Sequence, residues 1–215
     1  MTNGFDWASF KGSPAGLKWM RRDLPDLDKT ISRVPQKRVA VQAGANLGIY
    51  PKRLAQTFET VYAFEVSAEL FPLLYANAPE KNIYRYQAAL GFERELVGTS
   101  RTRRDGKANE LHEGITHVAG KGCVPTLRLD DFNLPVCDLI ALDVEGFEFY
   151  ALRGATETIE RCRPILSVEI NKNAQYYGFT RDEVREFVTD ELGYRLIERL
   201  HADDVFEPVE WTAQC

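Results

Sequence analysis

The chain has 215 residues, a length that suits one domain, or one domain with an added N-terminal segment. Its hydrophobic content of 44% and charged content of 27% are ordinary for a folded soluble protein. The net charge of −5 gives no reason to expect nucleic acid as a partner, and no apolar run approaches the ~20 residues that span a bilayer.

Cysteine usage and the start of the chain are typical of a cytoplasmic protein. None of the cysteines forms a CxxC pair: Cys123, Cys137, Cys162 and Cys215. Neither a zinc site nor a redox motif is therefore indicated. The first ten residues, MTNGFDWASF, lack the basic and apolar regions of a signal peptide. We expect a cytoplasmic protein without a membrane partner.

Residues 1–36 are predicted as a helical extension that precedes a domain at residues 37–215. One face of the extension is apolar, with hydrophobic residues every three or four positions: Leu17, Met20, Leu24, Leu27, Ile31 and Val34. Pro25 should divide this pattern into two short helices. Trp7 and Trp19 could cover a pocket of the main domain.

The stretch Arg38–Glu65, RVAVQAGANLGIYPKRLAQTFETVYAFE, organises that domain. It predicts a strand, a glycine turn from Gly44 to Gly48, a helix, a second strand and a terminal carboxylate. A glycine turn that opens a helix presents free N–H groups to a ligand. An acid about 20 positions further on is placed to bind ribose hydroxyls. The stretch therefore predicts a nucleoside-cofactor pocket.

The next segments continue the alternation of helix and strand. Ser67 should cap a helix to about Ala78, and Ile83–Leu90 is predicted as a third strand, an order that favours a parallel sheet. The polar segment 92–124 lacks a sustained period and is predicted as a hairpin or a mobile excursion. Its basic residues and histidines could meet an anionic substrate, although a solvated loop is the simpler interpretation: Arg101, Arg103, Arg104, His112 and His117.

The second half predicts two more buried strands and an edge hairpin. Leu139–Leu142 is an uninterrupted apolar run that leads into Asp143-Val144-Glu145-Gly146. A helix should follow, and then a strand at Ile165–Ile170 that carries Glu169 near its end. Thr180 and Glu183 form a capping box for a further helix, which Gly193 stops. The last two strands, at 194–200 and 205–211, are predicted as an antiparallel hairpin joined at 202–204.

Ligands of an open α/β sheet bind beyond the carboxyl ends of its strands. At those ends the sequence places the glycine turn, Glu65, Gln87 with Ala88, Asp143 with Glu145, and Glu169 with Asn171. Glu65, Asp143 and Glu145 could instead cap the helices after them, but the placement of all these residues at one edge favours a site. The GxGxxG, GxxxxGK[ST] and GxSxG motifs are absent. The GxNxG turn that is present suits a single nucleoside with a short charged tail.

Several stretches resemble the FkbM-type methyltransferases. VQAGANLGIY and VYAFEVSAELFPLLYANA are similar to that family's D-V-G-A-N-x-G-x-Y and A-F-E-P motifs. TLRLDDF, DLIALDVEGFEFYALRGATETI and RPILSVEI are similar to its later L-D-D, D-V-E-G-x-E and P-x-x-x-x-E motifs. The resemblance runs from about Arg38 to Ile170. It implies a Rossmann-like class I methyltransferase fold, with a seven-stranded, mostly parallel sheet and the edge hairpin, and S-adenosylmethionine as the methyl donor, usually to a hydroxyl oxygen.

The resemblance also implies roles for individual residues. Gly44, Asn46 and Gly48 would hold the methionine end of the cofactor, Glu65 its ribose and Ala88 its adenine, while Asp143 would lie closest to the transferred methyl group. Gln42 stands where the family usually has an acid. A glutamine can still accept a hydrogen bond from the cofactor's ammonium group, but the charge pairing is lost.

Methyl transfer to oxygen is an in-line displacement that also needs a base for the hydroxyl proton. We assign this chemistry to Asp143, Glu145 and Glu169, with Glu145 or Glu169 as the base, because crowded carboxylates raise one another's pKa. The acceptor is expected to be a small molecule, such as a sugar or a natural product with a free hydroxyl.

Other interpretations stay open at this point. Asp143, Glu169 and Asn171 offer oxygen ligands that would suit Mg²⁺, although we do not favour a metal site. The domain could also bind S-adenosylmethionine without turnover, an alternative that Gln42 and the lack of a clear histidine base suggest. A third possibility is an α/β module for another nucleoside.

Overall fold

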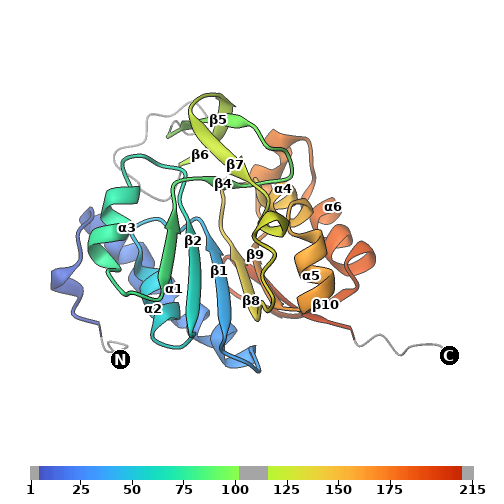
Figure 1. Cartoon of the computed structure of the whole chain (residues 1–215), viewed down its shortest axis with the longest axis horizontal. Coiled ribbons are helices and arrows are strands. Elements are labelled where there is room, and N and C mark those ends of the chain that lie inside the picture. Colours follow the sequence, from blue (N-terminus) through green and yellow to red (C-terminus); the bar gives the residue numbers. More distant parts are fainter. Residues whose placement is uncertain (1–4, 102–115, 210–215) are drawn as a thin grey trace.

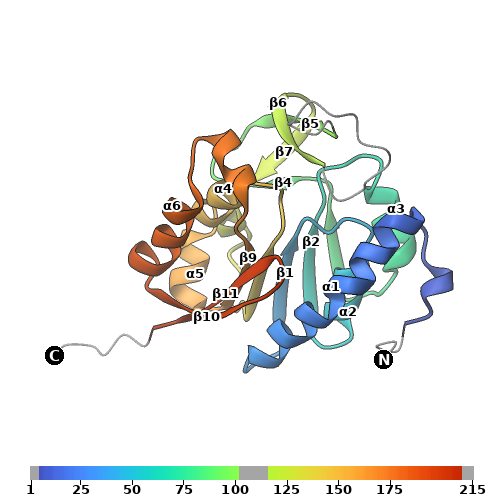
Figure 2. The same ribbon diagram turned by 180° about the vertical axis from the view of Figure 1, so that it is seen from behind.

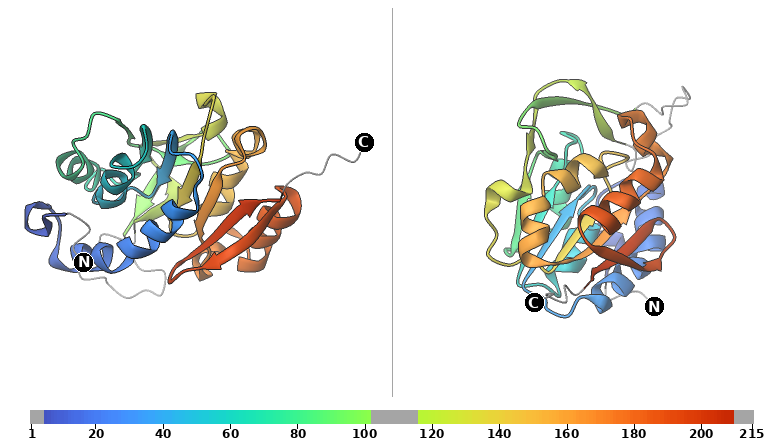
Figure 3. Two further views of the ribbon diagram at one scale, coloured as in Figure 1. Left: turned by 90° about the horizontal axis from the view of Figure 1, so that it is seen from below. Right: turned by 90° about the vertical axis from the view of Figure 1, so that its right-hand side faces the viewer.

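The computed structural model of the chain describes residues 5–101 and 116–209. Its central sheet has seven strands in the order β10-β11-β9-β8-β1-β2-β3 (Figure 1). The strands are β1 (Val39–Ala43), β2 (Thr60–Phe64), β3 (Ile83–Tyr86), β8 (Leu139–Leu142), β9 (Ile165–Glu169), β10 (Tyr194–Arg199) and β11 (Asp203–Pro208). Neighbours from β3 to β9 pair in parallel, whereas β11 is antiparallel to both β9 and β10. The predicted mostly parallel sheet with an antiparallel edge hairpin, shown in red in Figure 3, is confirmed.

Helices cover both faces of this sheet because successive strand residues point to opposite sides. Ala40 packs with α1 (Pro14–Arg33), α2 (Ile49–Ala55) and α3 (Phe71–Asn77), whereas Val41 packs with α4 (Glu148–Arg153), α5 (Thr156–Cys162) and α6 (Arg181–Glu186). All four residues of β8 are buried, as expected of a strand covered on both faces. Two apolar layers therefore hold the sheet.

Helix α1 is continuous from Pro14 to Arg33, so the predicted break at Pro25 is wrong. Ser13 caps the helix, since its Oγ accepts a hydrogen bond from the N–H of Gly16 at 3.0 Å. Pro25 lies on the solvent side, where the lost backbone hydrogen bond is tolerated, while Leu24 and Leu27 are buried against the sheet. Figure 2 shows α1 lying across that face of the domain.

A second, smaller sheet lies beyond the carboxyl ends of the central strands (Figure 1). It has the order β4-β7-β5-β6, with β4 (Ala89–Leu90), β5 (Leu96–Ser100), β6 (His117–Lys121) and β7 (Val124–Leu127). The predicted third strand is thus divided into β3 and β4, which belong to different sheets. Strands β5 and β6 pair antiparallel, which confirms a hairpin in this segment.

The remaining elements differ from expectation mainly at their ends. Helix α3 begins at Phe71, because Ser67 instead caps a preceding turn through a bond from the N–H of Leu70. The helix expected after Gly146 is divided into α4 and α5. The capping box at Thr180 is confirmed, and α6 continues into a π-helix at Phe187–Glu191. The described residues also form short 3₁₀ segments: η1 (Trp7–Ser9), η3 (Leu129–Phe132) and η4 (Lys172–Tyr177).

Three observations bear on the remaining sequence predictions. Cys137 is buried, as expected of a small core residue. In the described ranges, no helix combines the length and the apolar character needed to cross a bilayer. Arg103, Arg104, His112 and Cys215 lie outside the described residues.

Candidate active site

The turn after β1 is shaped by its contact with β8. Gly44 adopts a φ of +80°, and a Cβ atom there would lie 1.8 Å from the carbonyl oxygen of Asp143. Only glycine allows the two strand ends to approach so closely. Gly48 is also left-handed, at +85°, and forms the N-cap of α2 against the backbone of Leu74. The glycines of the turn therefore serve the packing that brings Asp143 to the site.

Glu65 ties the glycine turn to the end of β2. Its Oε2 accepts a hydrogen bond from the N–H of Asn46 at 2.7 Å, and its Oε1 accepts one from the N–H of Ser67 at 2.8 Å. The residue is 4% exposed. Burial raises the pKa of this carboxyl to about 7, with a further contribution from Asp143. Glu65 is thus a buried carboxylate on a preformed turn.

The loop after β8 presents Glu145 in an unusual backbone conformation. Glu145 has a φ of +56° and Gly146 a φ of +102°, so the chain turns sharply before α4. The Oε1 atom of Glu148 accepts hydrogen bonds from the N–H groups of Val144 at 3.0 Å and Gly146 at 3.1 Å. Glu148 is 2% exposed, and burial raises its pKa to about 7. A buried acid therefore holds the turn that aims Glu145.

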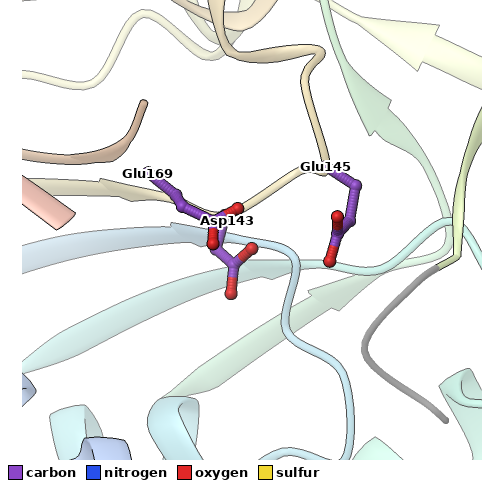
Figure 4. Close-up of side chains that lie close together, drawn as sticks. All are labelled: Asp143, Glu145 and Glu169. Carbon is purple, nitrogen blue, oxygen red and sulfur yellow. The ribbon is translucent and has the colours of Figure 1, made fainter. Parts of the chain in front are cut away.

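Asp143, Glu145 and Glu169 converge at this edge of the sheet. One carboxylate oxygen from each lies within 4.8 Å of the others, and Figure 4 shows the three side chains side by side. Burial raises the pKa of Asp143 to about 6, while its hydrogen bond with Glu169 lowers it. Burial, and then the charge of Asp143, raise the pKa of Glu169 well above its ordinary value. The predicted catalytic carboxylates form one cluster.

Amide side chains orient two of these acids. Asn173 donates a hydrogen bond from Nδ2 to Glu145 at 2.8 Å, and Asn171 donates one from Nδ2 to Glu169 at 2.7 Å. The Oδ1 atom of Asn171 accepts the N–H of Asn173 at 2.6 Å. Both ends of the Asn171 amide are therefore used within the protein, and we assign no metal ligand to it.

Asp203 is a fourth acid of the cluster, and sequence analysis placed it in a loop. It is the first residue of β11 and pairs with Glu169 in the register of the sheet. Its Oδ2 accepts a hydrogen bond from Ser167 at 3.2 Å. Burial raises its pKa to about 7, with Asp143 adding to the effect. Only the strand register brings Asp203 to Glu169, because 34 residues separate them in the sequence.

Two cavities meet at the cluster. The first lies under the small sheet and is lined by most of the predicted cofactor residues, with His117 from β6: Gly44, Asn46, Glu65, Ala88 and Asp143. His117 is buried, so its predicted place in a solvated loop is wrong. The second cavity, of about 580 Å³, lies beside α1 and is lined by Trp19, Tyr50, Glu169 and Asp203. Asn46, Asp143 and Glu145 line both cavities.

Gln42 and Trp7 lie apart from the walls of the cavities. Gln42 is 1% exposed and donates a hydrogen bond from Nε2 to the carbonyl of Ala43 at 3.1 Å. Its Oε1 is buried without a hydrogen-bond partner among the described residues. Trp7 packs against Phe5 and Phe10 and lines neither of these two cavities. Arg101 forms an ion pair with Glu69.

Comparison with known proteins identifies the family. The model of the methyltransferase FkbM domain matches residues 42–196, which is most of the chain. The chain therefore belongs to the FkbM family of S-adenosylmethionine-dependent methyltransferases, as its sequence motifs predicted. No curated protein matches it. Residues 14–33 of α1 and Asp203 lie outside the matched range.

Solved structures share the class I methyltransferase fold. An FkbM methyltransferase from Methylobacillus flagellatus KT aligns over 96% of this chain at a TM-score of 0.53 and 14% identity. This chain covers 62% of that protein's length. Precorrin 8W decarboxylase from Methanobacterium thermoautotrophicum aligns over 94% of this chain and 98% of its own length, at a TM-score of 0.53 and 12% identity. A precorrin-6y C5,15-methyltransferase from Geobacter metallireducens GS-15 aligns over 94% of this chain and 95% of its own length, at a TM-score of 0.52 and 12% identity.

Proposed function

We propose that the protein transfers the methyl group of S-adenosylmethionine to a hydroxyl oxygen of a small acceptor. The observation that carries this proposal is the meeting of two cavities at Asp143 and Glu145. A methyltransferase must hold the donor and the acceptor on opposite sides of one reacting carbon. The first cavity would take the donor and the second the acceptor.

The first cavity suits a nucleoside. A carboxylate offers about four acceptor positions, and Glu65 uses two of them for backbone N–H groups. The others are available for two ribose hydroxyls. Ala88 would lie beside the adenine, and the turn with Gly44, Asn46 and Gly48 would hold the methionine end. Gln42 has an unpartnered Oε1 that would accept a hydrogen bond from the ammonium group, but Gln42 does not line the first cavity, so this contact would require its side chain to move.

The carboxylate cluster suits the chemistry of the transfer. The donor supplies a sulfonium that makes its methyl group electrophilic. Asp143 would face this positive charge, which favours the ionised form of the clustered acids. Glu145 or Glu169 would then accept the hydroxyl proton of the acceptor as a general base. The orientation of both acids by asparagine amides supports this assignment.

Calorimetry with S-adenosylhomocysteine, NAD and ATP tests the proposal. We expect heat only with S-adenosylhomocysteine, and weaker binding in a Glu65→Gln variant. Asp190→Asn, at an exposed position of the π-helix, is the matched control and should bind as the wild type does. An absence of heat with S-adenosylhomocysteine would contradict the donor assignment.

A non-catalytic binding domain is the alternative. It would be favoured if the protein binds S-adenosylmethionine but forms no methylated product with any acceptor in a broad screen. Mass identification of a ligand that copurifies with the protein would narrow that screen.

A further inference from the structure

Acidic side chains line the second cavity where the strands of the central sheet end. Asp143, Glu169 and Asp203 lie at the ends or starts of adjacent strands, and all three line the cavity. Within the described ranges, neither a lysine nor an arginine forms an ion pair with any of them. The basic residues nearby are engaged or peripheral. Arg22 pairs with Asp23, and Lys172 and Arg181 are exposed at the rim.

The positive charge of the donor would lie close to Asp143 but far from Asp203. Its sulfonium is expected beside Asp143, which follows β8. Asp203 begins β11, two strands further from the donor in the sheet order β11-β9-β8-β1. Neighbouring strands are about 4.8 Å apart, so Asp203 lies about 10 Å along the sheet from the position of Asp143. A second positive group bound beside Asp203 would hold this carboxyl group in its ionised form, which the more distant donor would do less well.

An unpartnered polar atom also borders the cavity. The Oδ1 atom of Asn46 is fully buried and has no hydrogen-bond partner among the described residues, and Asn46 lines both cavities. Tyr50 lines the second cavity together with four acidic residues: Asp23, Asp26, Asp143 and Asp203. Buried polar groups are normally paired, so the Oδ1 atom of Asn46 is suited to a ligand that brings a hydrogen-bond donor.

We propose that the acceptor carries a protonated amine in addition to its reacting hydroxyl. The ammonium group lies between Asp203 and Glu169, where the ring of Tyr50 adds a favourable aromatic face. The hydroxyl then points toward Asp143 and Glu145, where the two cavities meet. The substrate class is an amino sugar, an aminocyclitol or a similar amino alcohol. This inference rests on the proposed function.

Paired probes test the inference on the wild-type protein saturated with S-adenosylhomocysteine. Binding of D-glucosamine and 2-deoxystreptamine is compared by nuclear magnetic resonance titration with that of D-glucose and myo-inositol. We expect the amines to bind at least about tenfold more tightly, because a hydrogen-bonded charge pair exceeds a neutral hydrogen bond by that factor. Equal binding of the neutral probes, or no detectable binding of either amine, would overturn the proposal.

Variants then locate the amine. Asp203→Asn should remove the preference for amines without changing the affinity for S-adenosylhomocysteine, whereas the exposed Asp190→Asn should leave both unchanged. A preference that survives in Asp203→Asn would overturn the placement. Failure of S-adenosylhomocysteine to bind the wild type would instead contradict the proposed function, so the two failures are distinguishable.

Discussion

Asp143 and Glu169 follow neighbouring parallel strands, and one carboxylate oxygen of each lies within 4.8 Å of the other. Burial raises the pKa of both carboxyl groups, and the charge of Asp143 raises that of Glu169 further. A carboxyl group with a raised pKa is suited to accept a proton near neutral pH. Under the proposed function, the positive charge of the donor beside Asp143 would favour the ionised form of this pair.

Replacing the proposed bases should separate catalysis from donor binding. Glu169→Gln keeps a hydrogen-bond donor for Asp143 but cannot accept a proton, so we expect methyl transfer to fall by about 10²–10⁴-fold if Glu169 is the base. The same loss in Glu145→Gln would identify Glu145 instead. Calorimetry with S-adenosylhomocysteine should show little change in either variant. Full activity in both would remove the assignment of a carboxylate base.

The stability of the ligand-free protein should fall as the pH rises. The pKa values of Glu65 and Glu148 are raised from 4.5 to about 7 in the folded state. Between these values the folded chain binds more protons than the unfolded chain, so the free energy of unfolding decreases with pH. Each group contributes on the order of 3 kcal/mol, and thermal unfolding across this window measures the sum.

A double variant provides the control for this pH dependence. Glu65→Gln combined with Glu148→Gln removes both titrations and should make the profile less steep, while the raised pKa values of Asp143, Glu169 and Asp203 keep part of the slope. A wild-type protein that is most stable above neutral pH would contradict the assigned pKa shifts.

Glu148 should matter through the turn that it holds. Glu148→Ala leaves the N–H groups of Val144 and Gly146 buried without an acceptor, at a cost of ~1–3 kcal/mol each. Glu148→Gln keeps a carbonyl acceptor and should cost less than half as much. Denaturant unfolding measures both, with Glu157→Ala, at a side chain of α5 that is 70% exposed, as a control. We also expect slower methyl transfer in the alanine variant, because Glu145 loses its fixed orientation.

A comparison of two left-handed glycines separates the contribution of the β1–β8 contact to stability from the cost of backbone strain. Gly44→Ala and Gly178→Ala both impose a left-handed conformation on alanine, which costs ~1–2 kcal/mol. Only Gly44→Ala adds a clash, with the carbonyl of Asp143, whereas the space around Gly178 is open. We expect the Gly44 variant to lose at least ~1–3 kcal/mol more in denaturant unfolding. Equal losses would show that the β1–β8 contact does not require glycine.

Gln42 can be tested with a pair of related ligands. Gln42→Glu should strengthen S-adenosylhomocysteine binding by about tenfold, because the ammonium group would gain a charge-assisted hydrogen bond. Methylthioadenosine lacks the amino-acid end and should bind both proteins equally. If calorimetry shows no difference for S-adenosylhomocysteine, the ammonium group lies elsewhere.

Sequence patterns were sufficient for the parallel sheet and most of its carboxyl edge. The apolar run of β8 leads directly into Asp143, and the glycine turn and Glu65 flank one helix, so local order alone places them. The rule that ligands bind at the carboxyl ends of strands then brings them together.

Features that depend on tertiary pairing could not be predicted in this way. Asp203 reaches the cluster only through the antiparallel register of β11 with β9. His117 lies in a polar segment, yet the small sheet folds over the first cavity and buries it. Pro25 is tolerated because its side of α1 faces solvent, which residue spacing alone does not reveal.

Helix α1 and the start of β11 both border the second cavity, and both lie outside the residues that match the family model. The family match thus includes Asp143, Glu145 and Glu169 but only part of the wall of the second cavity. Under the proposed function, exchanging residues 14–33 and the β10–β11 turn between relatives would change the wall of the acceptor cavity and leave the proposed donor residues in place. The parts of that wall at the two ends of the chain can vary in evolution while the carboxylates at its centre are kept.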